Sequence, residues 1–200
     1  MGKYNGPKDR LSRREGVDLF GKGAKLTRLN ILPGVHGPKG IIKKQSQYGK
    51  QLREKQKVKR IYGILEKQFR IYIGKAVKSK GNTGEALLSL LERRLDNVVY
   101  KLGFAESRPM ARQLVSHRHI LVNGKKLNIP SYHTEIDDVI SLTPKILDNP
   151  NVKKVVDLED YEVPAWLERK ATIGKVAADP KRSDITEIVS EQDIVEFYSR

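Results

Sequence analysis

The chain contains no cysteine among its 200 residues. Disulfide bridges, thiolate zinc sites and cysteine nucleophiles are therefore excluded. Aromatic residues are also scarce, at 6%, and hydrophobic residues make up 38%, which supports a modest core and argues against a large catalytic barrel. No segment approaches the roughly 20 consecutive apolar residues of a membrane helix, and residues 1–20 lack the apolar run of a secretory signal. We expect a soluble protein that stays in the compartment where it is made.

Positive charge is abundant and unevenly distributed along the chain. Residues 1–90 carry 22 Lys/Arg and 6 Asp/Glu, residues 91–130 carry 8 and 3, and residues 131–200 carry 9 and 15, for a net charge of +15. This asymmetry predicts that the first two-thirds of the chain bind an anionic polymer. We expect the acidic remainder to face solvent or basic protein neighbours.

The first 44 residues contain eight glycines and no sustained periodicity. Such a composition buries too little apolar surface to offset the entropy of ordering. We interpret this segment as an extended basic arm, either disordered or ordered against RNA. From Gln45 to about Val77, apolar residues recur mostly at three- and four-residue steps, which predicts one helix, or two helices broken near Gly63. The members of this apolar face are Tyr48, Leu52, Val58, Ile61, Leu65, Phe69 and Ile73.

A run of cations marks this helical segment. Residues 50–60 hold six Lys/Arg and a single acid, Glu54. Four of the cations share one stripe of the helix because they recur at steps of three and four. Their mutual repulsion is largely uncompensated unless a polyanion balances it, so we favour a phosphate-facing stripe over a solvated face. Its members are Lys50, Arg53, Lys57 and Arg60.

Residues 82–142 have the pattern of two short helices followed by a hairpin. Asn82 and Glu85 resemble a capping box, an apolar stripe runs from Leu88 to Leu102, and Gly103 is placed to end that helix in a left-handed conformation.

A second helix is expected after Ser107, with Pro109 in its first turn. Asn123 and Gly124 predict a type I′ hairpin turn. A third strand is expected over 139–142.

Seven cations lie within nineteen positions of this module, from Arg108 to Lys126. A small scaffold with so many cations is most simply explained by a phosphate-rich partner. Arg108 and Arg112 are one helical turn apart. We expect both on the face away from the contact between the two helices, the helix seam, where each guanidinium can make bidentate hydrogen bonds to a phosphate. The candidate RNA-binding residues of the whole chain are Arg10, Arg13, Arg14, Lys43, Lys44, Lys50, Arg53, Lys57, Arg60, Arg93, Arg94, Arg108, Arg112, Gln113, Ser116, His117, Arg118, His119, Asn123, Lys125 and Lys126.

The remaining features indicate no reaction chemistry. The acidic pair Asp137–Asp138 is more typical of a solvated turn than of a catalytic pair, and we expect Trp166 to be a packing residue. Short strands are expected at Val152–Val156 and Ile173–Val176. The predicted fold class is α+β: an extended arm (1–44), a helical basic domain (45–90), a small α/β module of two helices on a short antiparallel sheet (91–153), and an acidic segment that packs back on both domains (154–200).

Several motifs resemble those of one known family. The module carries RRLDN at 93–97, ARQLVSH at 111–117 and HILVNG at 119–124, and the chain ends in IVEFYSR at 194–200. These segments closely resemble the bacterial small-subunit ribosomal protein S4 family, and further similar segments extend the resemblance over essentially the whole length. Many members of that family hold zinc through cysteines in their first forty residues, whereas this chain resembles the zinc-free variety. We therefore expect neither metal nor cofactor, since His36 alone is no zinc site, and we expect the arm to depend on RNA for its order.

The resemblance implies a primary binder of small-subunit ribosomal RNA that attaches at a helix junction in the 5′ domain. It also implies nucleation of the subunit body, a contribution to translational accuracy, and contacts with small-subunit proteins S5 and S12. It further implies a cytoplasmic protein that is neither an enzyme nor a homo-oligomer and has no membrane or small-molecule partner. An organelle ribosome is an alternative location.

Two other functions are open at this point. Arg94, Leu95 and Asp96 mimic part of a catalytic motif of pseudouridine synthases, which carry the same module, although pairing with a nearby arginine explains Asp96 better and little chain is left for a catalytic domain. The second alternative is a free-standing chaperone or stress protein that binds tRNA or stalled ribosomes. Such proteins are usually little more than the module, whereas about 90 residues precede it here.

Overall fold

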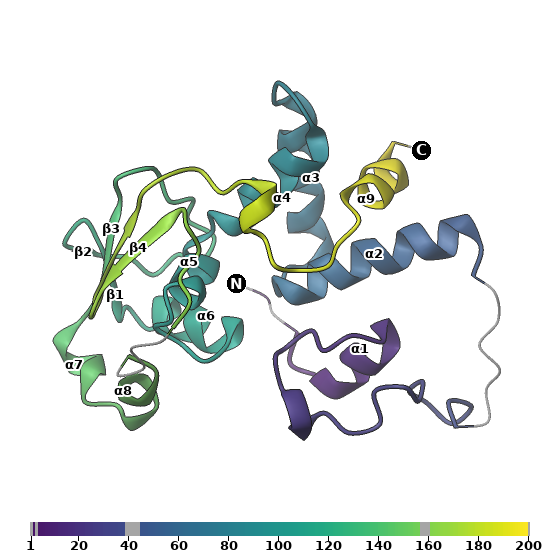
Figure 1. Ribbon diagram of the computed structural model, residues 1–200, viewed down its shortest axis with the longest axis horizontal. Coiled ribbons are helices and arrows are strands. Elements are labelled where there is room, and N and C mark those ends of the chain that lie inside the picture. The colour runs from purple at the N-terminus through teal and green to yellow at the C-terminus, as the bar shows by residue number, and fades with distance from the viewer. Residues whose placement is uncertain (1, 3, 39–44, 157–160, 200) are drawn as a thin grey trace. The chain divides into compact units, whose positions relative to one another are not determined.

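The computed structural model describes residues 2, 4–38, 45–156 and 161–199 (Figure 1). The chain divides into two compact units, Met1–Gly84 with Ile188–Arg200 and Glu85–Glu187. The fold is a mixture of helices and one antiparallel sheet, as the α+β prediction requires. Within these ranges no helix has the length and apolar character needed to cross a bilayer.

The helical part of the first unit is two helices and not one, α2 (Gln47–Ile61) and α3 (Glu66–Lys78). Gly63 separates them with a φ of +63°, a left-handed conformation that glycine adopts without strain. The amide of Ile64 closes the turn by donating to the carbonyl of Lys59 at 2.9 Å. Val58 and Phe69 are fully buried as expected, but Tyr48 and Leu65, which the period placed on the apolar face, are exposed.

Residues 188–200 return to the first unit through α9 (Glu191–Tyr198), which packs against α2. Gln51 donates to the Glu196 carboxylate at 2.7 Å. The rings of Phe69 and Tyr198 lie 6.0 Å apart. Because α9 supplies aromatic rings to this small core, a segment remote in sequence completes the N-terminal unit.

The basic arm contains more regular structure than its glycine content predicts. Residues 8–15 form α1 (Lys8–Glu15), and residues 23–25 form a 3₁₀ turn, η1 (Gly23–Lys25). The Glu15 side chain is only 2% exposed and pairs with Arg53, at 3.2 Å, and with Arg60. Arg13 also donates to the carbonyls of Ile31 and Leu32. Tertiary ion pairs and side-chain hydrogen bonds, rather than an apolar period, therefore hold this segment.

In the second unit, the single helix expected over 83–102 is interrupted. The structure has α4 (Thr83–Glu92) and α5 (Leu95–Lys101), with Arg94 in an extended conformation between them. The amides of Leu95 and Asp96 donate to the carbonyls of Tyr132 and Pro130, at 2.8 and 3.1 Å. These tertiary bonds replace the intrahelical bonds of a continuous helix, so a nonlocal contact breaks a locally favourable pattern. Gly103 ends α5 with a φ of +69°, as predicted.

A five-stranded antiparallel sheet completes the second unit. Its order is β2-β1-β3-β5-β4. α5 and α6 share one hydrophobic core with it, in which Trp166 is buried as expected. The elements that follow α5 are α6 (Arg108–Ser116), β1 (Ile120–Val122), β2 (Lys125–Lys126), β3 (Val139–Leu142), α7 (Pro144–Leu147), α8 (Pro150–Val156), β4 (Leu167–Lys170), β5 (Ile173–Val176) and the 3₁₀ turn η2 (Arg182–Asp184).

The strand expected at Val152–Val156 is wrong, since this segment is helix α8. Pro150 stands at the first helical position, where its missing amide hydrogen costs little, and Asn149 accepts the amide of Asn151 at 3.0 Å. Val152 and Val155, one turn apart, are buried. The strand expected at Ile173–Val176 is present as β5, and its partner β4 was not predicted.

Glu66 links three elements of the first unit and makes its stability sensitive to acid. Tyr198 donates to its carboxylate at 2.7 Å, and Lys55 and Lys59 lie at 3.2 and 3.0 Å. Burial opposes ionisation, but these hydrogen bonds outweigh it and lower the pKa of Glu66 to about 2. Because the folded pKa lies below the unfolded value, the stabilisation is complete above the unfolded pKa and is lost as the pH falls toward 2.

The free energy of unfolding should fall as the pH is lowered from 5 to 2.5. We expect this fall to be about 1 kcal/mol smaller in Glu66→Gln than in wild type, after allowance for solvent screening of this partly exposed group. Urea titrations at several pH values measure the effect. Glu106→Gln, at an exposed position, is the matched control and should leave the slope unchanged. Equal slopes for Glu66→Gln and wild type would show that this carboxylate contributes nothing.

Candidate nucleic-acid interface

The β1–β2 hairpin has the turn that its sequence predicts. Asn123 and Gly124 have φ values of +50° and +77°, as a type I′ turn requires. The Asn123 amide donates to the Asp138 carboxylate at 2.8 Å, and its oxygen accepts the amide of Val139 at 2.9 Å. Asn123 therefore fixes the turn against β3. Asp138 is buried by this role and is not the solvated residue that was expected, whereas Asp137 is exposed.

Beside this turn lies a cluster of cationic side chains, here called the hairpin patch. Arg118, at the end of α6, is exposed, and so are the two lysines of β2. The rings of His117 and His119 lie 6.2 Å apart. Within the described part of the chain, no ion pair engages any of these side chains. The hairpin patch comprises His117, Arg118, His119, Lys125 and Lys126, with Gln113 and Ser116 exposed on the preceding turn of α6.

Backbone strain and electrostatics both mark the hairpin patch. Arg118 has a φ of +62°, which is costly for a side chain with a Cβ. Burial lowers the pKa of His119, and the nearby charges of His117, Lys145 and Lys126 lower it further. A phosphate placed here would relieve this repulsion. Lys145 was not among the sequence candidates because it follows β3 and approaches the patch only through the fold.

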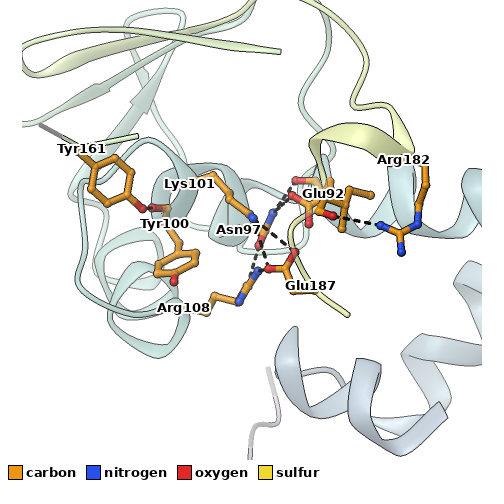
Figure 2. A network of polar contacts seen from close by, with 9 residues as sticks. Glu92, Asn97, Tyr100, Lys101, Arg108, Tyr161, Arg182 and Glu187 are labelled. Atoms are coloured by element: carbon orange, nitrogen blue, oxygen red, sulfur yellow. Dashed lines mark hydrogen bonds and ion pairs between the residues drawn. The ribbon is translucent and has the colours of Figure 1, made fainter. Parts of the chain in front are cut away.

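Arg108 belongs to an internal network and not to an exposed face (Figure 2). Its guanidinium pairs with Glu187, donates to the Asn97 side chain at 2.8 Å, and stacks 4.7 Å from the centre of the Tyr100 ring. Lys101 approaches the same Glu187 carboxylate at 3.3 Å. Burial opposes ionisation of Glu187, but the two cations lower its pKa below the ordinary value.

The arginines around Asp96 are also engaged within the module. Arg94 is buried and donates to both Asp96 oxygens, at 3.0 and 2.6 Å, and Arg112 lies 3.8 Å from the same carboxylate. Arg93 donates to the Thr134 carbonyl. The Arg108 and Arg112 side chains are 14% and 12% exposed. The expectation that both project away from the helix seam is therefore wrong, because internal carboxylates draw them inward.

The α2 stripe is also largely neutralised from within, contrary to the expectation of uncompensated repulsion. Arg53 and Arg60 pair with Glu15, and Lys57 pairs with Glu54 at 3.1 Å. A local count of charges missed Glu15 because it comes from α1. Lys50 remains exposed, as do Arg10 and Arg14 on α1. Lys43 and Lys44 lie outside the described residues.

The pairing of Asp96 with arginine leaves it no free carboxylate for catalysis. No group of three or more His, Cys, Asp or Glu side chains that could hold a metal lies in the part of the chain that the structure describes. What the module presents outward is the hairpin patch. A helical basic unit joined to a small helix–hairpin module with exposed, unpaired cations defines a class of RNA-binding proteins rather than of enzymes.

Comparison with known proteins makes the class specific. Residues 3–92 match the family described as Ribosomal protein S4/S9 N-terminal domain, and residues 93–140 match the S4 domain. The chain is 51% identical over 203 aligned residues to the Small ribosomal subunit protein uS4 of Akkermansia muciniphila, covering 100% of both chains. The chain therefore belongs to the bacterial-type ribosomal protein S4 family, in its cysteine-free form. This is a family of structural, non-enzymatic ribosomal proteins that bind ribosomal RNA.

The network around Glu187 predicts that Arg108 acts mainly on stability. Arg108→Ala leaves a mostly buried carboxylate that, among the described residues, keeps its ion pair with Lys101 alone. We therefore expect a loss of about 2–3 kcal/mol in the free energy of unfolding. Arg118→Ala, at an exposed position, should change it by less than about 0.5 kcal/mol. Urea denaturation of the two full-length variants compares them. Equal stabilities would contradict the structural role assigned to Arg108.

Proposed function

We propose that this chain is a component of the small ribosomal subunit and a primary binder of its ribosomal RNA. The observation that carries the proposal is the hairpin patch: Arg118, Lys125 and Lys126 are exposed, and no ion pair among the described residues engages them. The related protein of Akkermansia muciniphila is named as a small-subunit protein, and membership of the same family supports the same assembly for this chain. We place it in the cytoplasm with the bacterial ribosome.

The proposed target is a helix junction in the 5′ domain of the small-subunit RNA. A-form RNA has a deep, narrow major groove that side chains do not read, so recognition rests on shape, phosphates and 2′-hydroxyls. A folded junction brings several phosphate backbones close together. The separate basic surfaces of the two units suit such a target, because each can neutralise a different strand and release its counterions. Binding at this place early in assembly would nucleate the body of the subunit.

The finer parts of the proposal come from the family resemblance. We infer contacts with proteins S5 and S12, a contribution to translational accuracy, and action as a single copy per subunit rather than as a homo-oligomer. The acidic character of residues 131–200, with 9 Lys/Arg against 15 Asp/Glu, supports contact with basic protein neighbours.

The candidate residues divide into three groups by their surroundings. The hairpin patch, Gln113, Ser116, Lys50, Arg10 and Arg14 are proposed to contact RNA directly, because they are exposed or border the exposed cluster. Residues whose polar groups are held within the fold are proposed to shape that surface, namely Arg13, Arg53, Lys57, Arg60, Arg93, Arg94, Arg108, Arg112 and Asn123. Lys43 and Lys44 keep their place as proposed contacts on sequence grounds alone.

The salt dependence of RNA binding tests the hairpin patch. For the double variant Lys125→Gln/Lys126→Gln, we expect weaker binding to a transcript of the 5′ domain. The log–log slope of affinity against salt should also be shallower by about 1.4–1.8, since each lost phosphate contact removes about 0.7–0.9. Filter binding at several salt concentrations measures both.

The matched control is Lys153→Gln/Lys154→Gln, which removes the same charge from exposed positions on α8 and should leave the slope unchanged. A slope that falls equally in both double variants would indicate nonspecific attraction by net charge. An unchanged slope in the Lys125/Lys126 variant would remove the patch from the interface. Stoichiometric cosedimentation of the chain with small subunits in sucrose gradients tests the assembly itself.

A further inference from the structure

One face of α3 is basic, exposed and outside the set of residues assigned to RNA so far. The helix runs from Glu66 to Lys78 and buries Phe69, Tyr72, Ile73 and Ala76. The opposite side, here called the Gly74 face, is exposed along the whole length of the helix. It consists of Lys67, Arg70, Ile71, Gly74, Lys75, Val77 and Lys78.

Within the described residues, only one of the four cations on this face, Arg70, has an acidic partner. No ion pair engages Lys67, Lys75 or Lys78 in the part of the chain that the structure describes. The acid of the helix, Glu66, binds Lys55, Lys59 and Tyr198, and on this face it reaches Arg70 at 3.6 Å. Among the described residues, the three lysines of the Gly74 face are therefore uncompensated, unlike most of the stripe on α2.

The presence of glycine at position 74 has no explanation in the described structure of the first unit. It stands inside a regular helix, where glycine is the least favourable residue apart from proline. A Cβ added at this position would meet no atom within 4 Å, and Gly74 is not among the residues with positive φ. Neither packing nor backbone conformation calls for glycine here. A partner that approaches the helix backbone closely would require a residue without a side chain at this position.

The apolar residues beside Gly74 fit the same partner. Ile71 and Val77 are 46% and 63% exposed although they occupy a helix with an intact apolar side. The wide, shallow minor groove of an A-form helix displays 2′-hydroxyls and base edges between two phosphate backbones. The ribose carbons that carry these hydroxyls can pack against apolar side chains. Lysines at both ends of a stripe with a small residue at its centre match that profile in charge and shape.

We propose that the Gly74 face docks into a minor groove of the ribosomal RNA, as a second RNA-binding surface distinct from the hairpin patch. Gly74 lets the helix backbone approach the sugars, and Lys67 and Lys78 neutralise phosphates on opposite rims. RNA is favoured over an acidic protein because the face is rich in lysine and the chain belongs to a family of ribosomal RNA-binding proteins. This inference rests on the proposed function, since it assumes that the chain binds ribosomal RNA.

The test uses substitutions with opposite effects on folding and on binding. Gly74→Ala and Gly74→Leu introduce better helix formers into open space, so we expect each to raise the Tm of the full chain by roughly 2–8 °C. Both should weaken binding to the 5′-domain transcript, Gly74→Ala by about tenfold and Gly74→Leu by more, because the added side chain separates helix and RNA. Lys67→Gln/Lys78→Gln should make the salt slope shallower by about 1.4–1.8, with Lys153→Gln/Lys154→Gln as the charge-matched control.

The outcomes separate the two proposals. If wild type binds the transcript, the Lys125→Gln/Lys126→Gln variant binds it weakly and Gly74→Leu binds like wild type, the Gly74 face is not an RNA surface and the proposed function stands. If wild type itself does not bind, the proposed function fails and this inference fails with it. Raised Tm together with graded loss of affinity supports the inference, because a merely structural role for Gly74 would move the two quantities in the same direction.

Discussion

The basic side chains of this protein repel one another, and the fold depends on a few buried or partly buried carboxylates that neutralise some of these cations. Glu15 holds Arg53 and Arg60, Asp96 holds Arg94, and Glu187 holds Arg108 with Lys101. Glu15 and Glu187 lie far in sequence from their partners, so their ion pairs act as tertiary contacts, whereas Asp96 pairs with Arg94 two residues away. In each case the loss of one partner would leave a charge in a poorly solvated place.

The same pairing determines which cations remain for a partner. In the described ranges, no acid pairs with Arg118 or with the lysines of the hairpin patch and the Gly74 face, whereas much of the α2 stripe is neutralised from α1. Net charge alone does not distinguish these surfaces, because all of them have a high density of Lys and Arg. What distinguishes them is the position of the acids after folding. A polyanion bound to the unpaired cations would complete the charge balance of the ribonucleoprotein.

Local sequence patterns predicted much of the fold because the responsible interactions are local. The hairpin turn follows from the tolerance of Asn123 and Gly124 for positive φ, and the end of α5 follows from Gly103. The break at Arg94 was not predictable in this way, since the amides of Leu95 and Asp96 bond to a loop about 35 residues farther along. The segment of helix α8 was predicted as a strand because its valines are β-branched, which favours strands. Its helix start signals, Asn149 and Pro150, favour the helix that the structure has.

The candidate site was predictable in outline but not residue by residue. Spacing identified the cations of α6 and the hairpin, yet it placed Arg108 outward, where the structure turns it toward Glu187, almost eighty residues away in sequence. The lysines of α3 are not among the predicted contacts, because the apolar period of that segment indicates only which side is buried.

The most direct test of the account is lysine reactivity toward an acylating reagent, measured by mass spectrometry for the full chain with and without the 5′-domain transcript. The account predicts that RNA protects Lys125, Lys126, Lys67 and Lys78. Exposed Lys153 and Lys154 should react equally in both states, and Lys55 and Lys101, which are buried in ion pairs, should react slowly in both. Equal reactivity of Lys125 and Lys126 with and without RNA would contradict the claim that unpaired cations form the interface.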